Sequence, residues 1–249
     1  MIPRIIHYCW FGKKKIPKEF LSYIEGWKKL CPDFEIKKWT EDNFDFCKSR
    51  YAREAYRAQK WAFVSDYARF RILYDYGGIY LDTDVELLKS LEGILKECEE
   101  DDIRGFMGIE RPETGDVAPG LISAAEPHNP VIRDLLLGYK GRRFNLENGQ
   151  QDMTTVVEYT TDYMKARGFN GRDELWDNDG FRVYPSKYFN PLDMNTGKVA
   201  ITDDTYSIHH YASSWVDGYS KFRGKVYKVI RKHLGEKRAE GFRKIVGKK

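Results

Sequence analysis

The chain has 249 residues, of which 41% are hydrophobic, 32% charged and 15% aromatic, and its formal net charge is +4. This size and composition suit one sizeable folded domain, and they exclude a low-complexity or disordered chain. The sequence has no run of 18 apolar residues, so we expect no membrane span. The first residues are too poor in apolar side chains for a signal peptide. The four cysteines include no CxxC pair, which indicates reduced thiols in the cytoplasm.

Strand and helix patterns alternate through the first half of the chain. The longest helix is expected over residues 54–76, because no proline or glycine interrupts it before Gly77 and Gly78. The alternation predicts an α/β fold with a mainly parallel sheet. The other expected strands are 4–10, 34–39, 79–85, 104–109, 121–125, 181–185 and 206–210; the other expected helices are 19–30, a short one capped by residues 40–43, one ending near 98, 130–139 and 153–167, with 110–120 and 186–204 as loops.

Two aspartates end the strand that follows the long helix. Side chains two residues apart on a strand point to the same face, so Asp82 and Asp84 can converge on one cation at the strand's carboxyl end. A Mg²⁺ or Mn²⁺ ion held by one or two carboxylates usually completes its shell with water and phosphate oxygens. The pair is therefore a candidate seat for a metal-bound diphosphate, and the alternative is a solvated strand end.

An aspartate and an arginine share one stripe of the long helix. Asp66 and Arg69 fall on the same face as Ala62 and Leu73, which is unusual for a plain core helix. Because this stripe leads directly to the Gly-Gly-strand-Asp unit, we expect both side chains at the site. The alternative is an ion pair on a solvated helix face.

Three strings of residues together resemble the DXD-containing sugar transferases: Ile5–Gly12, Ser65–Tyr74 and Tyr76–Val85. More narrowly they are similar to the capsular-polysaccharide-type glycosyltransferases of family 32, whose core is similar to the glucosylating domains of large clostridial toxins. The resemblance returns at 209–215, and it is loose between about residues 95 and 205. It implies a GT-A (Rossmann-like) catalytic domain over residues 1–217, a nucleotide-sugar donor, Mn²⁺ or Mg²⁺, and hexosyl transfer with retention at the anomeric carbon. We favour a UDP-sugar over a GDP-sugar, and the sequence leaves this choice open.

The resemblance also implies a role for each matching residue of the first half. Trp10 would stack on the nucleobase, with a core tryptophan as the alternative. Asp66 would accept hydrogen bonds from the donor sugar, and Arg69 would lie near the sugar and the diphosphate. Asp82 would touch the ribose or sugar and reach the metal through water, whereas Asp84 would be the direct metal ligand.

The matching residues near position 210 close the site in such enzymes. The resemblance implies a histidine or a polar residue beside the metal and phosphate, and we choose His210, with Ser213 as the toxin-like choice and His209 left open. Adjacent strand residues point to opposite faces, so at most one histidine should ligate. Trp215 would cap the leaving diphosphate, with a lid anchor or core residue as the alternative.

The reacting carbon needs a neighbouring polar group and a route to retention. By the same resemblance Gln150, Gln151 or Asp152 lies beside that carbon, and Gln151 is our choice among the three. The alternative for this stretch is a helix N-cap by Asp152. No carboxylate nucleophile is identifiable, so we expect attack on the same face as the leaving group, with the leaving phosphate taking the acceptor's proton. Charge on the diphosphate would be absorbed by a metal at Asp84, by Arg69 and by His210.

Basic residues crowd the end of the sequence. Residues 218–249 have the pattern of a cationic amphipathic helix, which suits an anionic membrane surface on the inner face of the plasma membrane. The alternative is an ordinary helix with solvated lysines, and no nucleic-acid-binding motif accompanies the charge.

The expected activity is transfer to a glycan or lipid-linked saccharide in cell-surface polysaccharide synthesis. Three rivals remain. One is a glycoside hydrolase that uses two carboxylates without a metal. The others are a non-catalytic sugar- or nucleotide-binding protein on the same scaffold, and a protein-modifying effector similar to the toxins.

Overall fold

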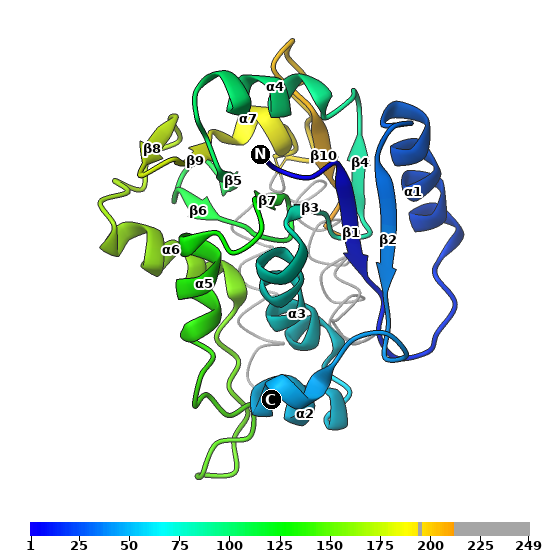
Figure 1. Cartoon of the computed structure of the whole chain (residues 1–249), viewed down its shortest axis with the longest axis vertical. Coiled ribbons are helices and arrows are strands. Elements are labelled where there is room, and N and C mark those ends of the chain that lie inside the picture. Colours follow the sequence, from blue (N-terminus) through cyan, green and yellow to red (C-terminus); the bar gives the residue numbers. More distant parts are fainter. Residues whose placement is uncertain (194–195, 212–249) are drawn as a thin grey trace, which may run out of the picture. The chain divides into compact units, whose positions relative to one another are not determined.

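A computed structural model describes residues 1–193 and 196–211 (Figure 1). These residues fall almost entirely within one compact unit, Met1–His210. The expected tail helix over 218–249, together with Ser213 and Trp215, lies outside the described residues. Among the described helices, none is long and apolar enough to cross a bilayer.

The described part of the chain alternates strands and helices, as the sequence predicts. The strands are β1 (Ile5–Cys9), β2 (Glu35–Trp39), β3 (Gly78–Tyr80), β4 (Val85–Leu87), β5 (Gly105–Arg111), β6 (Asp116–Val117), β7 (Ser123–Ala125), β8 (Trp176–Asn178), β9 (Phe181–Tyr184) and β10 (Ser207–His209). The helices are α1 (Lys18–Leu30), α2 (Arg50–Arg57), α3 (Trp61–Tyr76), α4 (Glu92–Glu100), α5 (Pro130–Leu137), α6 (Val156–Ala166) and α7 (Ser186–Phe189), with a 3₁₀ turn, η1, at Phe46–Lys48.

One large sheet forms the centre of the fold. Its strand order is β2-β1-β3-β7-β5-β9-β8, with β6 paired to β5. The pairings give β2, β1, β3, β5 and β9 one common direction, and β7, β6 and β8 the opposite one. The predicted mainly parallel α/β sheet is thus confirmed. Because β1, β3 and β5 share a direction, the residues at their carboxyl ends lie along the same edge of the sheet.

Two hydrophobic cores lie on the two faces of this sheet. Successive strand residues alternate between them: Ile79 and Phe106 belong to the core with α1, α4 and α7, whereas Tyr80 and Met107 belong to the core with α2, α3, α5 and α6. Every residue of β3 is buried, which is typical of a strand covered on both faces. The chain leaves this covered environment only at the end of β3, at the same edge of the sheet as the carboxyl ends of β1 and β5.

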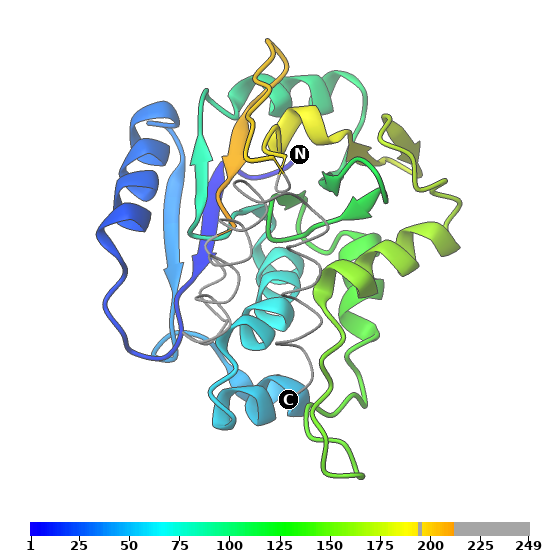
Figure 2. The ribbon, with the colours of Figure 1, turned by 180° about the vertical axis from the view of Figure 1, so that it is seen from behind.

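A separate two-stranded sheet completes the described part. Strand β10 lies beside β4 (Figure 2). The two pair antiparallel, with His209 opposite Val85. The next residue continues the pairing, because the His210 N–H donates to the Asp84 carbonyl at 3.0 Å. A segment more than 120 residues away in sequence thereby lies against the aspartate pair.

The prediction of one continuous helix over 54–76 is wrong, because two helices occupy this stretch. α2 ends at Arg57 and α3 begins at Trp61. Between them Gln59 takes the left-handed conformation, with φ at +57°, and the Lys60 N–H returns to the Ala55 carbonyl at 2.9 Å. A left-handed residue commonly ends a helix, but neither glycine nor asparagine signals it here.

The strand expected to run to Val85 also ends early. β3 stops at Tyr80, and the four residues before β4 form a turn in which the Val85 N–H donates to the Asp82 carbonyl at 3.1 Å. The two aspartates therefore sit on a turn, so strand alternation is not the reason that they converge.

Smaller differences concern caps and short elements. Residues 40–43 form a turn and not a helix cap; the cap of η1 is Asp45. α6 begins at Val156 with Thr155 as its N-cap, so Asp152 does not cap it. Three short elements, β6, β8 and α7, occupy stretches without a predicted strand or helix.

A fully buried histidine fixes the entry into β3. The Trp39 indole donates to His7 Nδ1 at 3.1 Å, which leaves the proton on Nε2 to be donated to the Gly77 carbonyl at 2.9 Å. Next to it Gly78 has φ of +94°, and a Cβ there would lie 2.7 Å from the Ile5 carbonyl oxygen. Burial lowers the pKa of His7 to about 4, because a charged imidazole would lose its hydration there.

This gives a prediction about acid stability. Between pH 6.5 and 4 the unfolded chain binds a proton at His7 that the folded chain does not, so the free energy of unfolding should fall as the pH drops through that window. The loss from His7 should be on the order of 3 kcal/mol, at about 1.4 kcal/mol per pH unit. The histidine NMR signals of the folded protein test it: His7 should titrate near 4, and a midpoint near 6.5 would contradict the assignment.

Candidate active site

Asp82 is held in a fixed position just beyond β3. The Tyr80 hydroxyl donates to Asp82 Oδ1 at 2.9 Å, and Arg69 Nη2 lies 3.3 Å from the same oxygen. The backbone N–H of Asp82 donates to the Gly120 carbonyl at 2.9 Å. One oxygen of this carboxylate is thus occupied by the protein, and the side chain cannot rotate without losing two partners.

The buried partner of Asp82 is the Asp66–Arg69 pair on α3. Arg69 Nη2 lies 3.2 Å from Asp66 Oδ1, and the two residues are only 3% and 7% exposed. The alternative interpretation, an ion pair on a solvated helix face, is therefore wrong. Asp66 and Arg69 point inward, as the stripe on the helix predicts. The Arg69 guanidinium also lies 5.0 Å from the centre of the Tyr80 ring.

These groups shift one another's pKa. Burial raises the pKa of Asp66 to about 7, with Arg69 opposing the shift. Burial also raises the pKa of Asp82, again against the charge of Arg69. For Arg69 burial works toward a lower pKa, but the two carboxylates and Tyr80 outweigh it and raise that pKa. The site therefore contains a permanent positive charge whose compensation depends on two acids, the buried Asp66 and the partly exposed Asp82.

Asp84 faces a histidine from the second sheet. His209 Nε2 lies 3.2 Å from Asp84 Oδ1, and His209 is only 9% exposed. One donor atom from each of Asp82, Asp84 and His209 lies within 4.8 Å of the others. Burial alone would lower the pKa of His209, but the contact with Asp84 outweighs it and raises that pKa. Two carboxylates and an imidazole can hold a divalent cation.

His210, the choice made from the sequence, points elsewhere. Its Nε2 lies 2.8 Å from Glu86 Oε2, and its ring stacks on Tyr23 at a centroid distance of 4.8 Å. The alternation expected for adjacent strand residues does hold, but β10 is registered so that His209 takes the inner position. This register depends on pairing with β4, which the local sequence does not show.

A third carboxylate, Glu110, was missed by the sequence reasoning. It lies near the end of β5, with a side chain 13% exposed, and its Oε1 is 3.8 Å from His209 Nδ1. Burial raises its pKa, while His209 acts against that shift. The available signal was its position directly after the strand expected at 104–109, which places it on the same sheet edge as the aspartates.

Trp10 lies at the carboxyl end of β1, next to the end of β3 in the sheet. The residue is half-buried, its indole N–H donates to the Lys14 carbonyl at 2.6 Å, and its ring contacts Phe20 edge-on at 6.1 Å. Its place at the sheet edge is compatible with nucleobase stacking, which stays a prediction.

Gln151 is not brought into contact with the aspartates among the described residues. Its backbone bridges to Asn145 in a hairpin-like loop. The neighbouring Asp152 pairs with Arg142 at 2.6 Å. The Arg142 guanidinium in turn lies 4.9–5.3 Å from the ring centres of Tyr51, Tyr139 and Tyr159. The role of Gln151 at the reacting carbon stays a prediction.

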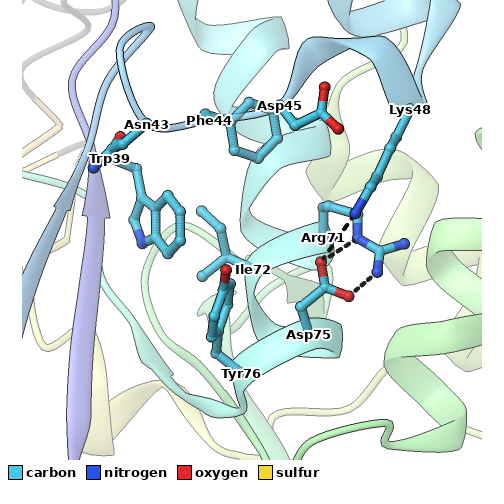
Figure 3. Close-up of a pocket in the computed structure, with 9 residues that line it drawn as sticks. All are labelled: Trp39, Asn43, Phe44, Asp45, Lys48, Arg71, Ile72, Asp75 and Tyr76. Carbon is cyan, nitrogen blue, oxygen red and sulfur yellow. Dashed lines mark hydrogen bonds and ion pairs between the residues drawn. The ribbon is translucent and has the colours of Figure 1, made fainter.

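A small pocket, whose lining includes neither aspartate, lies between the loop that precedes α2 and the last turns of α3 (Figure 3). Trp39, Phe44 and Tyr76 supply its aromatic wall, and Asp75 pairs with Arg71 and Lys48 on the other side. Its volume is about 80 Å³. Ligand pockets for small molecules usually measure about 300–1,000 Å³, so this pocket is too small for a nucleotide sugar.

Comparisons with known proteins decide the family. The family model described as "Glycosyltransferase sugar-binding region containing DXD motif" matches residues 17–101. An uncharacterized glycosyltransferase, L373, of Acanthamoeba polyphaga mimivirus is 38% identical over 233 residues, which covers 86% of this chain and 84% of that protein. The chain belongs to the DXD glycosyltransferases. The predicted family is thus confirmed.

Other relatives of this glycosyltransferase match over shorter stretches. Inositol phosphoceramide mannosyltransferase 3 of Schizosaccharomyces pombe is 31% identical over 102 residues, which span 38% of this chain but only 27% of that enzyme. Among solved structures, the PaToxG glycosyltransferase superposes with a TM-score of 0.51 at 19% identity, over 67% of this chain and 70% of that one. A glycosyltransferase involved in glycosylation of the PBCV-1 major capsid gives 0.50 at 13%, over 86% and 95%. These likenesses confirm the GT-A-type fold.

Gly120 gives a test of this geometry. A Cβ at Gly120 would lie 2.0 Å from Asp82 Oδ2, so Gly120→Ala should push the carboxylate away from Tyr80 and Arg69 and destabilise the protein by about 1–3 kcal/mol. Gly26→Ala is the matched control, because nothing lies within 4 Å of its Cβ and the helix gains about 0.5–1 kcal/mol. Denaturant unfolding of both variants measures the difference, and equal stabilities would contradict the described contact.

Proposed function

We propose that this glycosyltransferase is a retaining enzyme that takes its sugar from a nucleotide-diphosphate donor bound through Mn²⁺ or Mg²⁺. A UDP-sugar is our first choice and a GDP-sugar the second. The observation that carries the proposal is the unequal environment of the two aspartates. Asp82 is engaged by Tyr80 and Arg69, whereas Asp84 faces His209.

The residues around Asp84 fit a hard divalent cation. Carboxylate oxygens suit Mg²⁺ and Mn²⁺, and the donor atoms of Asp82, Asp84 and His209 lie close enough together to share one ion. We assign Asp84 and His209 as direct ligands, with His209 in place of His210, and Asp82 as a contact made through water. When bound, the cation would stabilise negative charge on the leaving diphosphate.

Arg69 is placed to act on the same charge. Its guanidinium is buried, and it is held from two sides by Asp66 and Asp82. A positive group fixed in advance stabilises developing charge without the cost of reorganisation. Asp66 accepts hydrogen bonds from hydroxyl groups of the donor sugar, and Trp10 stacks on the base. The roles predicted for Ser213 and Trp215 at the diphosphate concern residues outside the described part of the chain.

Retention follows from attack on the face that the leaving group occupies. The bond between the anomeric carbon and the diphosphate oxygen breaks, and a bond to the acceptor oxygen forms on the same side. The acceptor's proton passes to the leaving phosphate oxygen, so no carboxylate nucleophile is needed. Gln151 is the proposed neighbour of the reacting carbon.

The acceptor is a glycan or a lipid-linked saccharide, in the synthesis of a cell-surface polysaccharide. The similarity to inositol phosphoceramide mannosyltransferases adds a nucleotide-linked mannose to the donors to be tried. The two-carboxylate hydrolase is less well supported, because Asp82 is bound to Arg69 and Tyr80. A non-catalytic binding protein would retain donor binding but release no sugar.

Asp84→Ala should abolish donor turnover while the fold is retained, because it removes the proposed direct metal ligand. The measurement is nucleotide release from a panel of UDP- and GDP-sugars with and without Mn²⁺. The same panel is followed by thermal shift, since a bound donor raises the melting temperature by mass action. Asp33→Ala, at an exposed site, is the control and should behave as the wild type.

Three outcomes would contradict the proposal. Full activity of Asp84→Ala without added metal would remove the metal from the mechanism. Sugar release without any nucleotide requirement would favour the hydrolase. Donor binding without turnover under every condition would favour the non-catalytic protein.

We also propose that the enzyme works at the inner face of the plasma membrane, held there by residues 218–249. Their cationic amphipathic pattern should bind anionic vesicles but not neutral ones. Liposome flotation of the whole chain and of a chain ending at residue 217 is the measurement, and the shorter chain should stay with the soluble fraction. No flotation of either chain with anionic vesicles would remove the membrane role.

A further inference from the structure

Glu110 is a nearly buried carboxylate at the edge of the sheet where the aspartates lie. Its backbone is fixed on β5, and its carbonyl accepts from Asn190 Nδ2 at 2.6 Å. A buried carboxylate is costly unless a charged or hydrogen-bonding partner compensates it. The nearest arginine in sequence, Arg111, is directed to Asp116 at 2.8 Å. Within the described part of the chain, His209 is the cationic or hydrogen-bonding side chain found closest to the Glu110 carboxylate, at 3.8 Å.

The ring of His209 lies between two carboxylates. Its Nε2 is 3.2 Å from Asp84 Oδ1, and its Nδ1 is 3.8 Å from Glu110 Oε1. The second distance is longer than a hydrogen bond, and a shift of about 1 Å in either side chain would bring the two atoms into hydrogen-bond range. Each ring nitrogen thus faces its own acid, on opposite sides of the imidazole.

We propose that Glu110 is a positioning residue: its carboxylate accepts a hydrogen bond from the Nδ1–H of His209, so that Nε2 presents its lone pair to the divalent cation of the donor site. A neutral imidazole carries one proton, and the partner of one nitrogen decides which nitrogen is left as ligand. Carboxylates commonly play this part behind metal-bound histidines. The inference rests on the proposed metal at Asp84, and it adds a residue that no sequence motif indicates.

The geometry separates Glu110 from the ligands themselves. The group of donor atoms within 4.8 Å of one another consists of Asp82, Asp84 and His209, and it does not include Glu110. Glu110 lies beside Nδ1 of the imidazole and Asp84 beside Nε2, so the contact through which Glu110 can position a ligand is the one with the ring of His209. Its loss should weaken the cation's binding without removing the direct ligands.

The test is a graded pair of variants at Glu110. Glu110→Gln keeps the shape and one acceptor oxygen, and it should weaken Mn²⁺ binding about tenfold; Glu110→Leu removes the acceptor and should weaken it up to about a hundredfold. Free Mn²⁺, counted by electron paramagnetic resonance, gives the dissociation constant directly. Turnover of both variants should recover as Mn²⁺ is raised, whereas Asp84→Ala should not recover.

Two controls separate this role from a structural one. Glu86→Gln removes a carboxylate from the neighbouring His210, so its Mn²⁺ affinity should stay within about twofold of the wild type if direct contact with His209 is what matters. Melting temperatures without metal should be close to wild type for Glu110→Gln, because the substitution is nearly isosteric.

The results distinguish the failure of this role from the failure of the proposed function. If the wild type binds Mn²⁺, Asp84→Ala does not, and both Glu110 variants keep wild-type affinity, then the role of Glu110 is overturned and the metal stands. A loss of affinity that follows the loss of thermal stability also overturns it. If the wild type binds no Mn²⁺, the proposed metal and the role of Glu110 fall together.

Discussion

The candidate site depends on one buried charge. Arg69 carries a guanidinium on α3 that is almost wholly removed from water, and two carboxylates and the Tyr80 ring take the place of its hydration. Removing one partner of such a buried pair typically costs about 3–5 kcal/mol, because the remaining charge is left uncompensated. The interaction joins the helix to the turn after β3, so the same contacts that satisfy Arg69 also place Asp82.

The surrounding backbone is arranged around this interaction. At the start of β3, His7 hydrogen-bonds to the Gly77 carbonyl. Gly77 and Gly78 lie so close to neighbouring atoms there that neither position has room for a Cβ. Gly120 leaves room for the second oxygen of Asp82. The pairing of β10 with β4 then brings His209 to Asp84. Asp82 consequently contacts α3 and β3, whereas Asp84 contacts β10. This difference in partners is the physical basis for giving the two aspartates different roles.

Much of this fold follows from local sequence. The periodicity of the first half predicts most strands and helices, and the inward stripe of Asp66 and Arg69 predicts their place at the site. Other features depend on contacts between distant segments. The break at Gln59 has no glycine or proline to announce it, and the turn that carries the aspartates is recognisable only from its hydrogen bonds.

The choice between His209 and His210 shows most clearly what local sequence cannot predict. His209 and His210 are neighbours with the same side chain, so composition and alternation cannot choose between them. The choice is made by the register of β10 on β4 and by the partners that each ring finds, Asp84 for one and Glu86 with Tyr23 for the other. Glu110 enters only when β5 is known to end at the same sheet edge.

The most direct test is the position of the cation itself. Crystals grown with Mn²⁺ and a nucleoside diphosphate would give an anomalous scattering peak at the metal. The account predicts a peak about 2.0–2.5 Å from the Asp84 carboxylate and from His209 Nε2, with Asp82 still bound to Tyr80 and Arg69. A peak at His210, or none near Asp84, would contradict it.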